Sequence, residues 1–130
     1  MSLRAILIVE DDTDINDIVC ELLREESYET TGATSLRAAR SHLKGDAPAC
    51  VVLDLNLPDG TGEDLLREMT KAGARSPCVL MSAAPDARRV AARFGVALVQ
   101  KPFEIQTLLV AVAAAIERAI VPRDSDVRCA

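Results

Sequence analysis

Acidic side chains directly follow an apolar run near the N-terminus, in the stretch ILIVEDD. Glu10, Asp11 and Asp12 come after residues 6–9, and Asp14 and Asp17 follow soon afterwards. Carboxylates this close repel one another unless a cation lies among them or some of them are protonated. The spacing therefore predicts a cation site at the end of this apolar run.

Three further residues with reactive or charged side chains also end short apolar runs. Asp54 ends VVLD, Ser82 follows CVLM and Lys101 follows ALVQ. Three carboxylates that converge at one place form a hard-oxygen site suited to Mg²⁺. A magnesium site beside a lysine is typical of phosphoryl transfer, in which a central carboxylate such as Asp54 can act as the nucleophile.

The elements that would bring these residues together alternate along the chain. Short apolar runs occupy residues 4–9, 28–33, 50–55, 78–81 and 97–100, and stretches of helical period occupy residues 14–26, 34–43, 62–73, 86–95 and 104–120. Continuous apolar strands separated by helices indicate a parallel sheet that is buried on both faces. The sequence therefore predicts a three-layer α/β sandwich, with its working site beyond the carboxyl ends of the strands.

The helical stretches carry apolar stripes that predict which residues face the sheet. In the first helix, Asp12 or Thr13 is expected to cap the first turn. The residues expected on the buried face of this helix are Ile15, Ile18, Val19, Leu22 and Leu23, and the stripe of the last helix ends at Ile120.

Composition narrows the functional classes. The chain has 130 residues, of which 49% are hydrophobic and 27% charged, which predicts one globular domain over residues 1–121 and a polar tail over residues 122–130. A net charge of -5 and 2% aromatic residues argue against nucleic-acid binding. The sequence has no apolar run long enough to span a membrane and no secretion signal, so we expect a cytoplasmic location. The cysteines are expected to be reduced structural thiols: Cys20, Cys50, Cys78 and Cys129.

Four segments together carry a family resemblance. ILIVEDD, VVLDLNLPDGTG, VLMSA and QKPF resemble the CheY-like receiver domain of bacterial two-component response regulators over residues 4–120. The resemblance implies a flavodoxin-like, doubly wound sheet of five parallel strands in the order 2-1-3-4-5, flanked by five helices.

The resemblance also implies roles for the acidic residues. Asp54 matches the phosphoacceptor, which would become 4-aspartylphosphate. Asp11, Asp54 and the backbone carbonyl of Asn56 match the protein ligands of Mg²⁺, with Mn²⁺ as a possible substitute, and Glu10 matches an acid that acts through metal-bound water. Asp12 lies one place beyond these positions and is expected to begin the helix.

Further positions match the phosphate-binding and switching residues of the family. Ser82 and the backbone of Ala83 match groups that contact the phosphoryl oxygens, and Lys101 matches a lysine that pairs with one of them. The peptide bond from Lys101 to Pro102 is cis in the family. Leu98 occupies the usual position of an aromatic switch residue, and the segment from Ser82 to Lys101 is shorter than in typical members.

The function implied is that of a phosphoacceptor in a phosphorelay, and not of an enzyme beyond self-phosphorylation and slow self-dephosphorylation. The phosphoryl group would come from a sensor histidine kinase or a histidine phosphotransfer protein. A conformational change would reach a protein partner through the face formed by the fourth helix, fifth strand and fifth helix. We expect a monomer or weak homodimer with no direct contact to nucleic acid or membrane.

Four alternatives remain open. Leu98 and the shortened segment suggest an adaptor that signals without phosphate, and the chain can equally be a receiver cut from a longer regulator or hybrid kinase. A phosphohydrolase with an aspartate nucleophile would need a second acid where Asn56 stands. A flavodoxin-like cofactor binder is disfavoured because the acids near Glu10 would repel a phosphate.

Overall fold

The central element is a sheet of five parallel strands, described here from a computed structural model in which residues 4–74 and 76–120 are placed. The strands are β1 (Ala5–Val9), β2 (Glu29–Ala33), β3 (Cys50–Leu53), β6 (Cys78–Ser82) and β7 (Ala97–Gln100). Their order in the sheet is β2-β1-β3-β6-β7. This order confirms the predicted doubly wound topology. The predicted polar tail and Cys129 lie outside the described residues.

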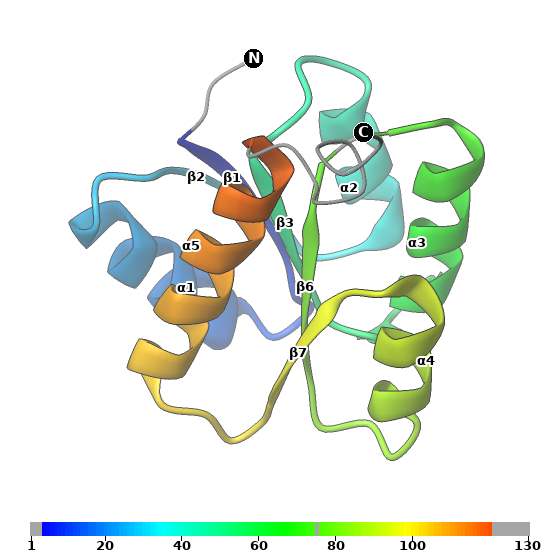
Figure 1. Cartoon of the computed structure of the whole chain (residues 1–130). Helices are drawn as coiled ribbons and strands as arrows, with labels where there is room; N and C mark the ends of the chain where they lie inside the picture. The colour runs from blue at the N-terminus through cyan, green and yellow to red at the C-terminus, as the bar shows by residue number, and fades with distance from the viewer. Residues whose placement is uncertain (1–3, 75, 121–130) are drawn as a thin grey trace, which may run out of the picture.

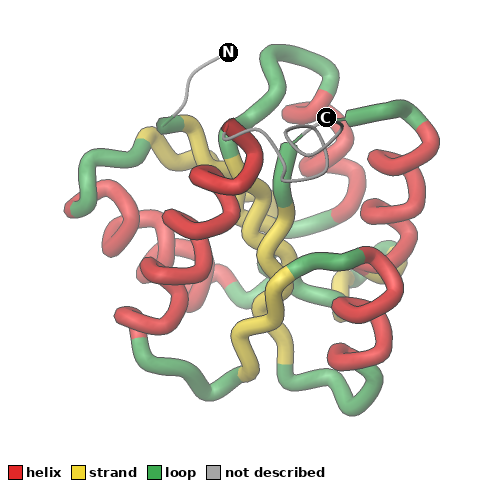
Figure 2. Tube along the Cα trace, viewed as in Figure 1, coloured by secondary structure: helices red, strands yellow, loops and turns green. Residues whose placement is uncertain are grey.

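Five helices cover the two faces of this sheet. They are α1 (Thr13–Glu25), α2 (Leu36–Leu43), α3 (Gly62–Lys71), α4 (Ala87–Phe94) and α5 (Ile105–Ile120). Figure 1 shows α1 and α5 on one face and α2, α3 and α4 on the other. In Figure 2 the strands lie between these two helical layers, so the predicted three-layer architecture is confirmed.

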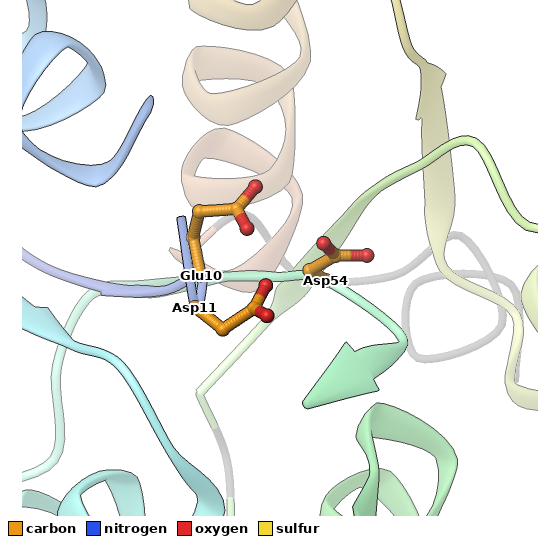
Figure 3. A group of neighbouring side chains, drawn as sticks. All are labelled: Glu10, Asp11 and Asp54. Carbon is orange, nitrogen blue, oxygen red and sulfur yellow. The ribbon is translucent and has the colours of Figure 1, made fainter. Parts of the chain in front are cut away.

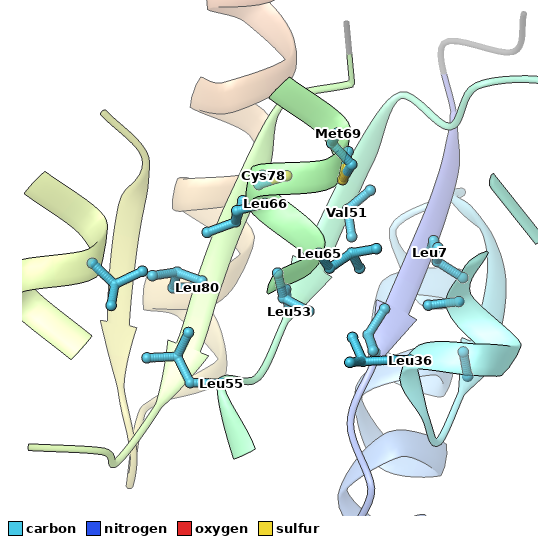
Figure 4. Packing of buried hydrophobic residues seen from close by; sticks show 14 of the residues in the cluster. Leu7, Leu36, Val51, Leu53, Leu55, Leu65, Leu66, Met69, Cys78 and Leu80 are labelled. Carbon is cyan, nitrogen blue, oxygen red and sulfur yellow. The ribbon is translucent and has the colours of Figure 1, made fainter. Parts of the chain in front are cut away.

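The core consists of two clusters of buried side chains, one on each face of the sheet. Leu53 and Leu80 point toward α3 and pack with Leu65 and Leu66 (Figure 4). On the opposite face, side chains of the sheet pack against α1 and α5, with Leu23 and Leu108 among the fully buried residues. All four residues of β3 are buried, because helices cover both of its faces.

Polar side chains and glycine define the helix ends close to the strand termini. The carboxylate of Asp12 accepts hydrogen bonds from the backbone N–H groups of Asp14 and Ile15 at 3.0 and 3.1 Å, so the expectation that Asp12 begins α1 is confirmed. Helix α4 ends at Gly95, whose φ of 65° lies in the left-handed region that glycine adopts easily.

Two residues expected in the core are exposed instead. Ile18 and Ile120 are each 55% exposed. Helix α1 presents a different face to the sheet, and that face includes the polar Asn16 together with Cys20. The prediction for Ile18 was wrong because an apolar stripe was assumed, whereas a polar side chain occupies the interior where its hydrogen bonds are satisfied.

A small antiparallel hairpin was not predicted from the sequence. Strand β4 (Asn56–Leu57) pairs with β5 (Gly60–Thr61) directly after β3. The hairpin occupies part of the segment LNLPDGTG and leads into α3. It therefore shapes the loop that follows Asp54.

Candidate functional site

Three carboxyl groups meet at the carboxyl ends of β1 and β3. The sheet register places Val9 opposite Leu53, so the residues that follow these two strands are neighbours. Among the described residues, Glu10, Asp11 and Asp54 each offer a carboxylate oxygen within 4.8 Å of the others. Figure 3 shows the carboxyl groups of Glu10 and Asp11 extending toward the side on which Asp54 lies. Glu10 and Asp54 are 1% and 6% exposed, whereas Asp11 is exposed.

The side chain of Lys101 reaches this acidic cluster from the end of β7. Its Nζ donates hydrogen bonds to Oε1 of Glu10 and to Oδ2 of Asp54, the latter at 3.0 Å. Burial disfavours the ammonium form, but the two carboxylates outweigh this effect and raise the pKa of Lys101. Burial also raises the pKa of Glu10, although the hydrogen bonds from Lys101 and Asp12 favour its carboxylate form.

Backbone contacts hold Asp54 in place between the strands. Its N–H donates to the carbonyl of Val9 at 2.9 Å, and the N–H of Asn56 approaches its Oδ1 at 3.4 Å. Asn56 is exposed at the start of the β4–β5 hairpin. The N–H of Gly62 closes the loop by donating to the carbonyl of Leu55 at 2.8 Å.

Gly62 allows α3 to begin directly beneath Asp54. A Cβ atom added at Gly62 would lie 2.4 Å from the backbone oxygen of Asp54 and 3.1 Å from Cα of Leu55. Atoms do not approach this closely without contact strain, so the backbone around Asp54 would have to move. The first turn of α3 therefore requires glycine at this position.

We expect Gly62→Ala to lower the free energy of unfolding by about 2 kcal/mol, because the added methyl group meets rigid backbone. Urea denaturation followed by circular dichroism measures the change. Gly45→Ala is the matched control, since its nearest neighbour would be the carbonyl of His42 at 3.9 Å. Equal stability of the two variants would contradict the steric argument.

The remaining predicted site residues lie at the ends of β6 and β7. Ser82 is buried at 1% exposure, and its Oγ accepts a hydrogen bond from the N–H of Ala84 at 3.0 Å. The backbone N–H of Lys101 donates to the carbonyl of Ser82 at 3.0 Å. Ala83 is exposed in the loop that leads from β6 to α4. The Lys101–Pro102 peptide bond is cis.

Leu98 lies on β7 at the side covered by α4. It is half-buried, pairs in register with Leu80 and packs against the same core cluster as Ala91. Together with Ala91 and Val96, it lines a shallow groove between α4 and the edge strand. A leucine has no ring and no hydroxyl group, so this side chain cannot undergo the ring rotation of an aromatic residue.

Sequence reasoning missed two polar side chains, one that contacts the backbone of the acidic cluster and one that links α3 to α4. Asn16 is buried in α1 and donates to the backbone carbonyl of Glu10 at 2.9 Å. Glu63, in the first turn of α3, pairs with Arg89 and Arg93 of α4 at 3.4 and 3.2 Å. The only sequence signal for Asn16 was its spacing, three and four residues before Val19 and Cys20, which are buried in the same helix.

The donor set at this site suits a hard divalent cation. All three side-chain groups are carboxylates, and Mg²⁺ prefers oxygen ligands of this type. The site is therefore an acidic metal-binding candidate with a lysine and a buried serine beside it.

No helix among the described residues is long and apolar enough to cross a membrane.

Comparison with known proteins identifies the family. Residues 6–113 match the response regulator receiver domain, and the chain belongs to this family. It is 35% identical over 121 residues to the regulatory protein VanRB of Enterococcus faecalis, covering 91% of this chain and 54% of that protein. Nodulation protein W of Bradyrhizobium diazoefficiens is 30% identical over 87% of this chain and 51% of its own length.

Solved structures agree with this assignment. NtrX from Brucella abortus superposes with a TM-score of 0.83 at 32% identity, covering 95% of this chain and 29% of that one. A CheY-like receiver domain protein from Methanospirillum hungatei gives a TM-score of 0.83 at 25% identity, covering 91% and 97%. The chain spans about half, or less, of the length of the first curated relatives, with 54%, 34% and 51% covered. It is thus a receiver domain of two-component response regulators, which is a signalling domain.

Proposed function

We propose that Asp54 accepts the phosphoryl group in this receiver domain. The observation that carries the proposal is the position of its carboxylate, which lies within 4.8 Å of the acids that end β1 and accepts a hydrogen bond from the ammonium of Lys101 at 3.0 Å. A carboxylate oxygen of Asp54 would attack phosphorus, and the bond from phosphorus to the donor would break as the donor leaves with its electron pair. The product is an aspartyl phosphate.

The acidic residues would hold Mg²⁺, or Mn²⁺ in its place. Asp11, Asp54 and the backbone carbonyl of Asn56 would bind the metal directly, and Glu10 through water. When bound, the metal supplies positive charge that neutralises the phosphoryl oxygens. The carboxylate oxygens within 4.8 Å of one another support this ligand set.

Ser82, Ala83 and Lys101 would bind the transferred group. The hydroxyl of Ser82 and the backbone N–H of Ala83 would donate to phosphoryl oxygens, and Lys101 would exchange its bond to Asp54 for one to the phosphate. Because the Oγ of Ser82 accepts a hydrogen bond from the N–H of Ala84, a shift of this hydroxyl toward the phosphoryl group would move the loop that leads to α4. Slow hydrolysis would follow by a water molecule whose access depends on the side chains of Asn56 and Ala84.

The proposed partners are a protein with a phosphohistidine and a downstream target protein. A sensor histidine kinase or a histidine phosphotransfer protein would supply the phosphoryl group in a cytoplasmic relay. The target would bind the face formed by α4, β7 and α5. Residues 1–121 would act as this domain, as a monomer or weak homodimer, and without turnover of a separate substrate.

Intact-mass spectrometry with acetyl phosphate tests the proposal. We expect the chain to gain one phosphoryl group when Mg²⁺ is present and none after chelation with EDTA. The half-buried Leu98 supports the second candidate, an adaptor that works without phosphate. The adaptor predicts no mass gain and no change in the amide spectrum when Mg²⁺ and acetyl phosphate are added.

A further inference from the structure

Within the described part of the chain, the position of the Asp11 carboxylate is set by the backbone of Asp11. Among residues 4–74 and 76–120, it has no hydrogen bond or ion pair to fix it. Glu10, in contrast, is bound by the ammonium of Lys101 and by the N–H of Asp12, the latter at 3.1 Å. The place of the Asp11 carboxylate relative to Asp54 therefore depends on the peptide that joins Glu10 to Asp11.

The side chain of Asn16 fixes this peptide. Its Nδ2 donates to the carbonyl of Glu10 at 2.9 Å and to the carbonyl of Ala33, at the end of β2, at 3.0 Å. Asn16 is 4% exposed, so water cannot replace these bonds. One amide group thus ties α1, the end of β1 and the end of β2 together, directly behind the acids.

Gly32 leaves the space in which the Asn16 amide lies. A Cβ atom at Gly32 would stand 2.3 Å from Oδ1 of Asn16 and 3.2 Å from its Cγ. The thiol of Cys20 approaches the same Oδ1 at 3.5 Å. The amide is therefore confined on its oxygen side, and this confinement directs its two N–H groups toward the carbonyls.

We infer that Asn16 is a positioning residue for the divalent metal site, acting through the Glu10–Asp11 peptide, and that Gly32 is required for its orientation. The inference rests on the proposed metal-dependent function of Asp11 and Asp54. Groups that orient metal ligands without touching the metal typically change metal affinity by about 10- to 100-fold when they are removed. Loss of the Asn16 amide is expected to act at the low end of this range.

Magnesium titration followed by amide NMR spectra measures the effect on protein that is fully folded. Asn16→Leu, which fills the same space without an N–H donor, should weaken Mg²⁺ binding by about tenfold. Asn16→Ala should weaken it similarly. Leu23→Ala, in a buried position two turns further along α1, should reduce stability but leave Mg²⁺ affinity unchanged.

A double-mutant cycle with Gly32 separates positioning from general loss of stability. Gly32→Ala should weaken Mg²⁺ binding by displacing the amide, whereas Thr31→Ala, at the neighbouring exposed position, should not. The effect of Gly32→Ala should vanish when Asn16→Ala is already present, because no amide is left to displace.

The outcomes distinguish the positioning role of Asn16 from the existence of the metal site itself. Wild-type affinity for Mg²⁺ in folded Asn16→Leu protein, or additive effects in the cycle, would overturn the role of Asn16 alone. A wild-type chain whose spectrum does not respond to Mg²⁺ would overturn the metal site itself, and the inference with it. Should Asn16→Leu not fold, Gly32→Ala decides the question, because it keeps the asparagine and alters a residue of the mostly exposed edge strand β2.

Discussion

Replacing Asp54 with asparagine is expected to reduce phosphorylation by acetyl phosphate to background while the fold is kept. The amide of asparagine has the same shape as the carboxylate but no anionic oxygen to attack phosphorus. It also removes one of the three carboxylates that would hold the metal. Lys101 remains paired with Glu10 in this variant, so no buried charge is left without a partner.

Intact-mass spectrometry of wild-type and Asp54→Asn protein, with and without Mg²⁺, checks this result. Asp59→Asn is the matched control, because Asp59 is an exposed aspartate five residues further along the same segment. Its carboxylate accepts hydrogen bonds from the N–H groups of Leu36 and Arg37 at 2.8 and 3.0 Å and does not belong to the acidic cluster. A phosphoryl mass gain retained in Asp54→Asn would exclude Asp54 as the acceptor, and a gain lost in Asp59→Asn as well would show that the effect is not specific to Asp54.

The sheet was predictable because its strands carry strong local signals. The residues of β1 and β3, and residues 78–81 of β6, are continuously apolar, as expected for strands covered on both faces. The edge strand β2 has the pattern ETTGA and is mostly exposed, so its own composition is a weak strand signal. Its presence followed from the alternation of elements, and its position beside β1 was implied by the family resemblance. The convergence of acids followed from the rule that parallel strands end at the same edge of a sheet.

The buried polar contacts were not predictable, because their partners are remote in the sequence. Asn16 is buried since the carbonyl of Ala33, 17 residues away, accepts its hydrogen bond. A helical-period count placed Ile18 on the buried face because it had no means of recognising that partner. Lys101 was predicted near the acids, but its pairing with both Glu10 and Asp54 depends on side-chain geometry across 91 and 47 residues of chain.

The pairing of Lys101 gives this residue a role in stability, in addition to its proposed role in phosphate binding. Its side chain is 18% exposed, and its ammonium is bound to two carboxylates whose side chains are 1% and 8% exposed. Removing one partner of a buried ion pair leaves the other charge without compensation, at a typical cost of 3–5 kcal/mol. Because two carboxylates share this one ammonium, both lose a partner when the charge is removed.

We therefore expect Lys101→Met to lower the free energy of unfolding by about 3 kcal/mol in the absence of divalent cations. Methionine keeps much of the apolar stem of lysine, so the change reports mainly on the charge. Urea denaturation in EDTA measures the loss. Lys71→Met, at an exposed position near the end of α3, should change stability by less than about 0.5 kcal/mol.

Two conditions should recover part of this loss if the uncompensated acids cause it. Mg²⁺ bound at the proposed site of the folded state should stabilise Lys101→Met more than wild type, in which the ammonium already neutralises the acids. Burial raises the pKa of Glu10 above its value in the unfolded chain, so the folded state binds a proton more readily and stability falls as the pH rises through that window. The hydrogen bond from Lys101 lowers the pKa of Glu10, so its loss should raise this pKa further, and the deficit of Lys101→Met relative to wild type should be smaller near about pH 5 than near about pH 7. A deficit that is independent of both pH and Mg²⁺ would assign it to packing and remove the electrostatic explanation, because lost apolar contacts respond to neither condition.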